Sequence, residues 1–111
     1  MDKKTYEKIK SMTMSHDDFM QEKLKDKDFQ YAWLRQTIED YTKDGDFATF
    51  YRAIERVVKA RTSVSELARQ LKMDRSNLSE ILNGKKEPKM QTAIKILNAL
   101  GYELTLSQKA C

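Results

Sequence analysis

The residues with the most telling chemistry lie between positions 75 and 83, where RSNLSEILN places short polar and charged side chains on one side of a predicted helix. Arg75 can grip the two acceptors of a guanine, and Asn77 can pair with an adenine. A helix that enters a DNA major groove presents its N-terminal residues in this way. The residues that we expect to contact DNA are Ser63, Arg75, Ser76, Asn77, Ser79, Glu80, Asn83, Lys85, Lys86 and Lys89.

Two short helices are expected to position this polar face. The first is predicted over residues 64–71, with Ser63 as its cap and Glu66 completing a capping box. Its apolar residues recur at the spacing of one helical stripe. Among them Ala68 is small enough to let a second helix cross at a steep angle.

A turn over residues 72–74 joins the two helices, and Asp74 is placed to cap the second one. The second helix, predicted over residues 75–83, turns its apolar side inward through Leu78, Ile81 and Leu82. The combination is typical of a helix-turn-helix. The alternative is a small helical hairpin with a solvated polar face.

The stretch from about Phe50 to Leu106 resembles the Xre/Cro family of helix-turn-helix repressors, through the segments SVSELARQL, DRSNLSEILNG and PKMQTAIKILNALGYEL. The resemblance implies DNA binding and a closing helix after the proline-containing loop. Two positions depart from the family pattern. Lys72 replaces a glycine of the turn, where a left-handed backbone would cost about 1 kcal/mol. Val64 replaces a glutamine that holds a phosphate in many members.

Charge is distributed unevenly along the chain. Residues 1–49 have nine basic and eleven acidic side chains, whereas residues 50–111 have twelve and six, a net charge of +6. A basic half favours a nucleic-acid face, and the mildly acidic half favours a separate surface for something else. The loop after Gly84 contributes Lys85, Lys86 and Lys89, which with Asn83 would position the protein on the phosphate backbone.

The N-terminal half is predicted to be helical as well. Residues 1–14 read as a loose helix or a flexible lead, followed by helices over about 15–24, 28–41 and 47–61, with a stop at KDGD (43–46). The fold class is therefore all-α: a lambda-repressor-like helix-turn-helix bundle with an N-terminal helical extension and a short C-terminal strand. We expect an extension over residues 1–46 and a DNA-binding domain over residues 47–111.

The segment DFMQEKLKDKDFQYAWLRQTIEDY resembles the lead of HigA-type antitoxins, at Asp18, Phe19, Leu24, Lys25, Asp26, Phe29 and Leu34. That resemblance implies an antitoxin that neutralises a small basic toxin of the RelE-like, mRNA-cleaving class and represses its own operon. The toxin-contacting residues would be Phe19, Leu24, Phe29, Trp33 and Leu34. The alternative is that Phe29, Trp33 and Tyr41, or most of them, are ordinary core residues. The second hypothesis is a stand-alone Xre-family regulator, in which the N-terminal helices serve stability, dimerisation or another ligand.

The C-terminal residues alternate between apolar and polar. Gly101 is placed as a helix cap, and residues 102–106 then read as a half-buried strand. A lone strand needs a partner, which favours a two-fold dimer through Tyr102, Leu104 and Leu106; a frayed tail or pairing with the toxin are the alternatives. The dimer would place two recognition helices about 10 base pairs apart on a palindromic site.

Other classes of function find little support. His16 is the one histidine and has no companion ligands for a metal, so neither a metal nor a cofactor is expected. No glycine-rich phosphate loop or nucleophile–base set argues for an enzyme. A polar N-terminus, no apolar run of membrane-spanning length and a single cysteine, Cys111, predict a cytoplasmic protein.

Overall fold

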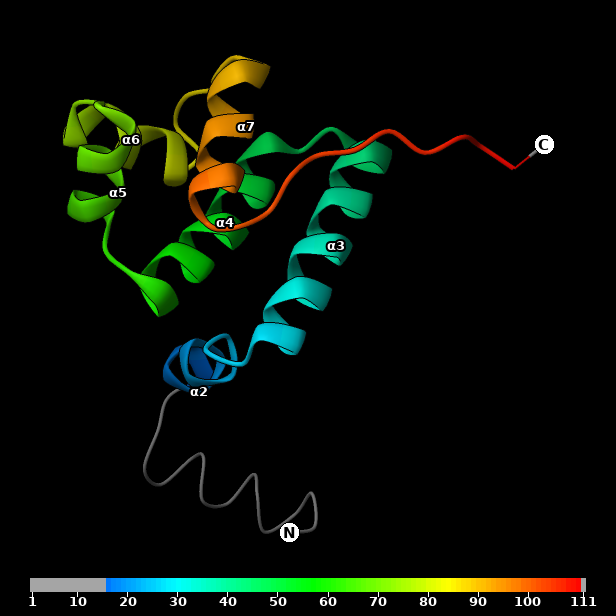
Figure 1. Ribbon diagram of the computed structural model, residues 1–111, viewed down its shortest axis with the longest axis horizontal. Helices are drawn as coiled ribbons and strands as arrows, with labels where there is room; N and C mark the ends of the chain where they lie inside the picture. Colours follow the sequence, from blue (N-terminus) through cyan, green and yellow to red (C-terminus); the bar gives the residue numbers. More distant parts are fainter. Residues whose placement is uncertain (1–15, 111) are drawn as a thin grey trace, which may run out of the picture.

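The computed structural model describes residues 16–110 (Figure 1). The predictions for residues 1–15, including the lead and the start of the first helix, and for Cys111 lie outside this range. The described helices are α2 (His16–Lys23), α3 (Lys27–Asp44), α4 (Phe47–Arg61), α5 (Val64–Leu71), α6 (Arg75–Leu82) and α7 (Met90–Ala99). Over residues 16–110 the fold is all-helical, as the sequence predicted, and contains no β-strand.

Helix α4 is the element around which the others pack. It contacts α2 and α3 from the N-terminal part of the chain and α5 and α6 from the helix-turn-helix. Figure 1 shows α5 and α6 on one side of α4 and α3 on the other. The apolar stripe of α4 explains this position, because Ile54, Val57 and Val58 are completely buried. α7 packs against α5 and closes the bundle.

Local hydrogen bonds set the ends of the two long helices. The Asp26 side chain accepts from the backbone N–H groups of residues 28 and 29 and thereby starts α3. Gly45, at φ 68°, ends α3 in a left-handed turn, so the helix reaches Asp44 and not residue 41 as predicted. Asp46 then caps α4 by accepting from Thr49 N (3.2 Å) and Thr49 Oγ1 (2.6 Å). The predicted start and end of α4 are confirmed.

One hydrophobic cluster runs from Leu24, just after α2, through α3 to α7. It contains Leu24 and Leu34 from the N-terminal part together with residues of α4–α7, such as Leu67, Leu78 and Leu97. Burying a leucine side chain contributes about 1.5–3 kcal/mol. The N-terminal helices therefore share their core with the helix-turn-helix, and α4 is the common wall.

The end of α7 is a Schellman turn around Gly101, which has φ 92°. The N–H of Tyr102 donates to Leu97 O (2.9 Å), and the N–H of Gly101 donates to Asn98 O (3.0 Å). The Arg61 guanidinium donates to the carbonyl of Leu100, which ties the end of α4 to the end of α7. The predicted glycine cap is confirmed, and it directs the following residues back towards α3.

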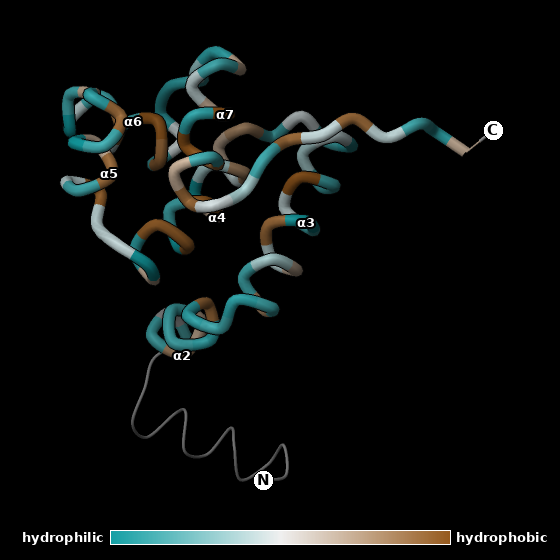
Figure 2. Tube along the Cα trace, in the orientation of Figure 1, coloured by the Kyte–Doolittle hydropathy of each residue, from teal (hydrophilic) through white to brown (hydrophobic). Residues whose placement is uncertain are grey.

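The predicted strand over residues 102–106 is not supported, because these residues form an extended segment without a ladder. Instead of a strand, the segment uses the side of α3 as its partner. The Tyr102 ring stacks on Tyr31 (centroids 6.2 Å apart), and its hydroxyl donates to Gln30 Oε1 (2.8 Å). Brown apolar positions alternate with white and teal ones along this segment in Figure 2. They include Leu104, 43% exposed, and Leu106, 99% exposed.

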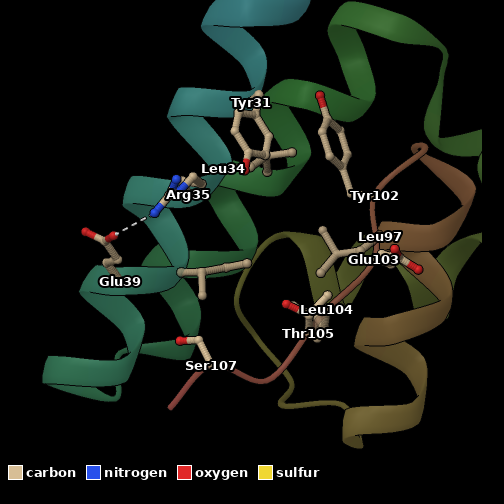
Figure 3. A pocket seen from close by; sticks show the side chains of 11 residues that line it. Tyr31, Leu34, Arg35, Glu39, Leu97, Tyr102, Glu103, Leu104, Thr105 and Ser107 are labelled. Carbon is tan, nitrogen blue, oxygen red and sulfur yellow. Dashed lines mark ion pairs between the residues drawn. The ribbon is translucent and has the colours of Figure 1, made fainter. Parts of the chain in front are cut away.

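A cleft of about 440 Å³ separates the extended segment from α3 (Figure 3). Tyr31, Leu34 and Arg35 line it from α3, and Tyr102 and Leu104 line it from the segment. Arg35 pairs there with Glu39 at 4.0 Å. The segment thus touches α3 firmly at Tyr102 and only loosely beyond it.

Candidate nucleic-acid interface

The turn between α5 and α6 has the geometry that its sequence predicted. Ser63 Oγ accepts from Glu66 N (3.1 Å) at the start of α5. Lys72 adopts the left-handed conformation at φ 56° and is the one non-glycine residue with positive φ among residues 16–110. Asp74 Oδ1 accepts from Ser76 N (3.3 Å) and starts α6. The cost of about 1–2 kcal/mol for a left-handed lysine is thus present in this turn.

Close packing between α5 and α6 fixes how the outer face is presented. Ala68 is 3% exposed, and both Leu67 and Leu78 are completely buried. Met73 N donates to Ala68 O (2.9 Å), which draws the turn against α5. A larger side chain at Ala68 would separate the helices, so the methyl group at this position sets their distance.

The outer face of α6 is open to solvent. Arg75, Ser76, Glu80 and the following Asn83 are exposed, while Asn77 and Ser79 are half-buried. Arg75 has no hydrogen-bond or ion-pair partner within residues 16–110, so its guanidinium is available to a ligand. Asn83 Nδ2 donates to Ser79 Oγ at 3.5 Å, the limit of a hydrogen bond.

The loop after α6 returns across this face. Gly84 N donates to Ile81 O and Lys85 N donates to Glu80 O, both at 3.0 Å, which completes a second Schellman turn. The exposed Lys86 then reaches back to α6, with its Nζ 2.5 Å from Asn77 Oδ1 and 4.0 Å from Glu80 Oε2. Helix α6 and the basic loop therefore form one continuous polar surface.

Gly84 is the functional position that the sequence analysis left without a role. Its φ is 77°, and an added Cβ would lie 2.7 Å from Ala48 Cβ and 2.8 Å from Ala48 Cα. The basic loop thus depends on close contact with the first turn of α4. A glycine directly after a helix was the available signal for the turn, but nothing local indicated the contact with Ala48.

The only acid of the basic loop is directed towards α3. The Tyr41 hydroxyl donates to Glu87 Oε1 at 3.4 Å, across 46 residues of sequence. Burial, and then the Glu87 carboxylate, raise the pKa of Tyr41. This contact keeps the Glu87 charge engaged with α3, while Lys85, Lys86 and Lys89 are exposed. The loop accordingly offers cations to an anionic ligand.

The residues predicted to contact a toxin occupy mostly interior positions. Leu24 is completely buried and Leu34 is 3% exposed, so both are core residues in this structure. Phe19, Phe29 and Trp33 are half-buried. Trp33 Nε1 donates to Ala53 O (3.1 Å), and its ring stacks on Phe29 at 6.5 Å between centroids. The exposed residues of α2 and α3 are mainly polar and charged.

Comparison with protein families identifies the domain that contains α5 and α6. Residues 54–107 match the family described as helix-turn-helix. Residues 54–107 are a helix-turn-helix domain of the Xre/lambda-repressor type. Comparison with curated proteins and with solved structures gave no match. The helix-turn-helix domain starts inside α4 and extends to Ser107 in the C-terminal segment, so α2 and α3 lie outside it.

A domain of this type indicates a DNA-binding regulator, and the family is typically not enzymatic. α6 is the second helix of the helix-turn-helix. Residues 16–110 contain no cluster of three or more histidine, cysteine or carboxylate side chains that could hold a metal ion. No helix in that range is both long and apolar enough to cross a membrane.

Proposed function

We propose that this chain is a sequence-specific repressor that binds an operator through α6 and acts as a dimer. The observation that supports the proposal is the arrangement of α6. Its inner side completes the core, while its outer side, with the free Arg75, stands open beside a loop with three lysines. An exposed polar helix face rigidly backed by a core is what reading of a major groove requires. The lysines supply the salt-dependent attraction to phosphates.

The test begins with selection of binding sites from a pool of randomised duplex DNA. The Arg75→Ala variant should then bind the selected site more weakly by about 1–3 kcal/mol, and should lose discrimination at one base pair. Fluorescence anisotropy at fixed salt measures both effects. The matched control is Arg35→Ala, which removes the same charge from α3 and should leave affinity within a factor of two. Equal binding by the Arg75→Ala variant and the wild type would refute the role of α6.

Dimerisation through the C-terminal segment is part of this proposal. Leu104 and Leu106 leave apolar surface in water, and burying it against a second copy of the segment would favour a dimer. The Leu106→Ser variant should shift the monomer–dimer equilibrium towards monomer in sedimentation analysis, with Lys109→Ser as the control. An unchanged equilibrium would place the dimer contact elsewhere.

A second candidate function is that of an antitoxin, and the charge of the N-terminal helices favours it. Residues 16–46 contain nine acidic and five basic side chains, a net charge of −4. Most of this charge lies on α2 and α3, across α4 from the recognition helix. A small basic toxin could be held there by charge complementarity while α6 remains on DNA. The phenylalanine and tryptophan side chains would then support this surface from beneath.

Co-expression with the product of the neighbouring gene tests the antitoxin hypothesis. A toxin should copurify with the chain and lose its effect on growth. The double variant Glu39→Lys with Asp40→Lys should weaken that complex, whereas the charge-conserving Glu39→Asp with Asp40→Glu should not. Absence of any complex, together with intact operator binding, would leave the stand-alone regulator.

A further inference from the structure

The contact between Lys86 and Asn77 determines what the recognition helix can offer to a base. Lys86 Nζ lies 2.5 Å from Asn77 Oδ1 and 4.0 Å from Glu80 Oε2, so that the ammonium group sits between two side chains of the α6 outer face. The side chains of Lys86 and Glu80 are each about half exposed, at 54% and 55%. The group is therefore on the side that would face DNA.

The chemistry of the two groups fixes the orientation of the amide. An ammonium group only donates, so the Asn77 atom that faces it must be the oxygen. The Nδ2 group, which has two N–H donors, then points away from Lys86. Reading an adenine requires an acceptor as well as a donor, because the asparagine must accept a hydrogen bond from N6–H while it donates one to N7. With one lone pair of its oxygen already engaged by a cation, Asn77 offers two free N–H donors and a weakened acceptor.

The geometry of the loop brings Lys86 close to α6. Gly84 at φ 77° reverses the chain after α6, and Lys85 N donates to Glu80 O (3.0 Å). Lys86 therefore leaves the turn one residue later and runs back over α6. The Glu80 carboxylate attracts the Lys86 ammonium group from one side, and Asn77 Oδ1 accepts a hydrogen bond from it on the other. The Glu80 carboxylate, engaged with a cation, becomes a weaker acceptor for a cytosine amino group.

We propose that Asn77 and Lys86 act as one donor unit that reads guanine, and that Lys86 is a specificity-determining residue as well as a backbone cation. The inference rests on the proposed operator binding through α6. Guanine is the base that shows two adjacent acceptors, N7 and O6, in the major groove. The free N–H groups of Asn77 and Lys86 match that pair. This proposal differs from the expectation that Asn77 pairs with an adenine.

Site selection from randomised duplex DNA tests the proposal with four proteins. The wild type and the Lys86→Arg variant, which retains a donor, should select guanine at one position of each half-site. The Lys86→Met variant frees the Asn77 oxygen and should select adenine at that same position. We expect the guanine-to-adenine preference ratio to fall about 5- to 150-fold, the range that one bidentate contact supplies. The Asn77→Ala variant identifies the position, because it should lose preference there.

Lys85→Met is the matched control, since it removes the neighbouring lysine without touching Asn77. It should lower affinity and the salt dependence for all sequences and keep guanine at the marked position. Adenine selected by the wild type, or guanine retained by Lys86→Met, would overturn the assignment while leaving operator binding intact. A wild-type chain that enriches no sequence would refute the proposed function, and the assignment with it.

Discussion

The glycine at position 84 allows a sharp test of how the basic loop is held. In the Gly84→Ala variant, the new methyl group would lie 2.7 Å from Ala48 Cβ and 2.8 Å from Ala48 Cα. The Cα atom belongs to the first turn of α4 and cannot rotate away. The loop or the start of α4 must therefore move, and the φ of 77° is unfavourable for alanine in any case.

The expected magnitude has two parts. A left-handed non-glycine residue costs about 1–2 kcal/mol, and overpacking costs about 1–3 kcal/mol. The chain supplies a control for the first part alone, because Gly45 has φ 68° and an alanine there would meet nothing within 4 Å. Gly45→Ala should thus lose about 1–2 kcal/mol of unfolding free energy, and Gly84→Ala about 2–5 kcal/mol.

Urea unfolding followed by circular dichroism measures both variants on the same scale. A difference of at least about 1 kcal/mol in unfolding free energy between Gly84→Ala and Gly45→Ala is the predicted signature of the close contact. Equal losses would show that the clash with Ala48 relaxes without cost, and would refute the argument that close packing fixes the loop. A folded Gly84→Ala protein should also bind DNA less tightly, since its lysines are displaced.

Three further predictions concern the core, a helix start and the response to pH. Ala68→Leu should lower the unfolding free energy by about 1–3 kcal/mol in urea, because α5 and α6 must separate; stability equal to the wild type would contradict the packing argument. Asp26→Ala should cost about 1 kcal/mol in the same assay, since two N–H groups at the start of α3 lose their acceptor; an equally costly Asp26→Ser would show that capping is not the cause. Burial raises the pKa of Tyr51 to about 12, so the neutral phenol is favoured in the folded state, and the stability that it contributes should be lost as pH rises from 10 towards 12. Tyr51→Phe should remove that part of the alkaline loss, as measured by unfolding midpoints at several pH values.

Local signals in the sequence were sufficient for most of the helix-turn-helix. Ser63 and Asp74 are capping residues in the structure because a short side chain with an oxygen before an apolar stripe has few other uses. The left-handed conformation of Lys72 was expected from the resemblance alone, because the family usually has a glycine at this position of the turn. In each of these cases the residue that gives the signal lies within a few positions of the structure that it predicts.

Contacts between distant segments were beyond the reach of the same reasoning. The alternation over residues 102–106 predicted a half-buried strand, but Tyr102 alone is half-buried and residues 103–106 are exposed. The element that covers Tyr102 is a helix and not a strand. Tyr102 finds Gln30 and Tyr31 on α3, some 70 residues earlier in the sequence. A period of two reports burial on one side and contains no information about which element provides it.

The same limit applies to the interface. Sequence analysis placed Asn77 and Lys86 in the DNA-binding set separately, because one lies on a helix and the other in a loop. Their contact depends on the reversal at Gly84, and that reversal depends on Ala48 of α4. Recognition chemistry of this kind depends on the tertiary fold as well as on the residue types in the helix.

The central position of α4 limits how the N-terminal part of this chain can evolve. The matched helix-turn-helix domain begins at residue 54, in the middle of α4, whereas the hydrophobic cluster also includes Leu24 and Leu34. Loss of α2 and α3 would expose one apolar side of α4, and the other side of α4 packs against α5 and α6. The N-terminal extension therefore cannot be exchanged as a separate module. Replacement of the extension during evolution would require substitutions on the side of α4 that faces α3. Residues on that side of α4 should therefore covary with residues of α3 more than with residues of α6.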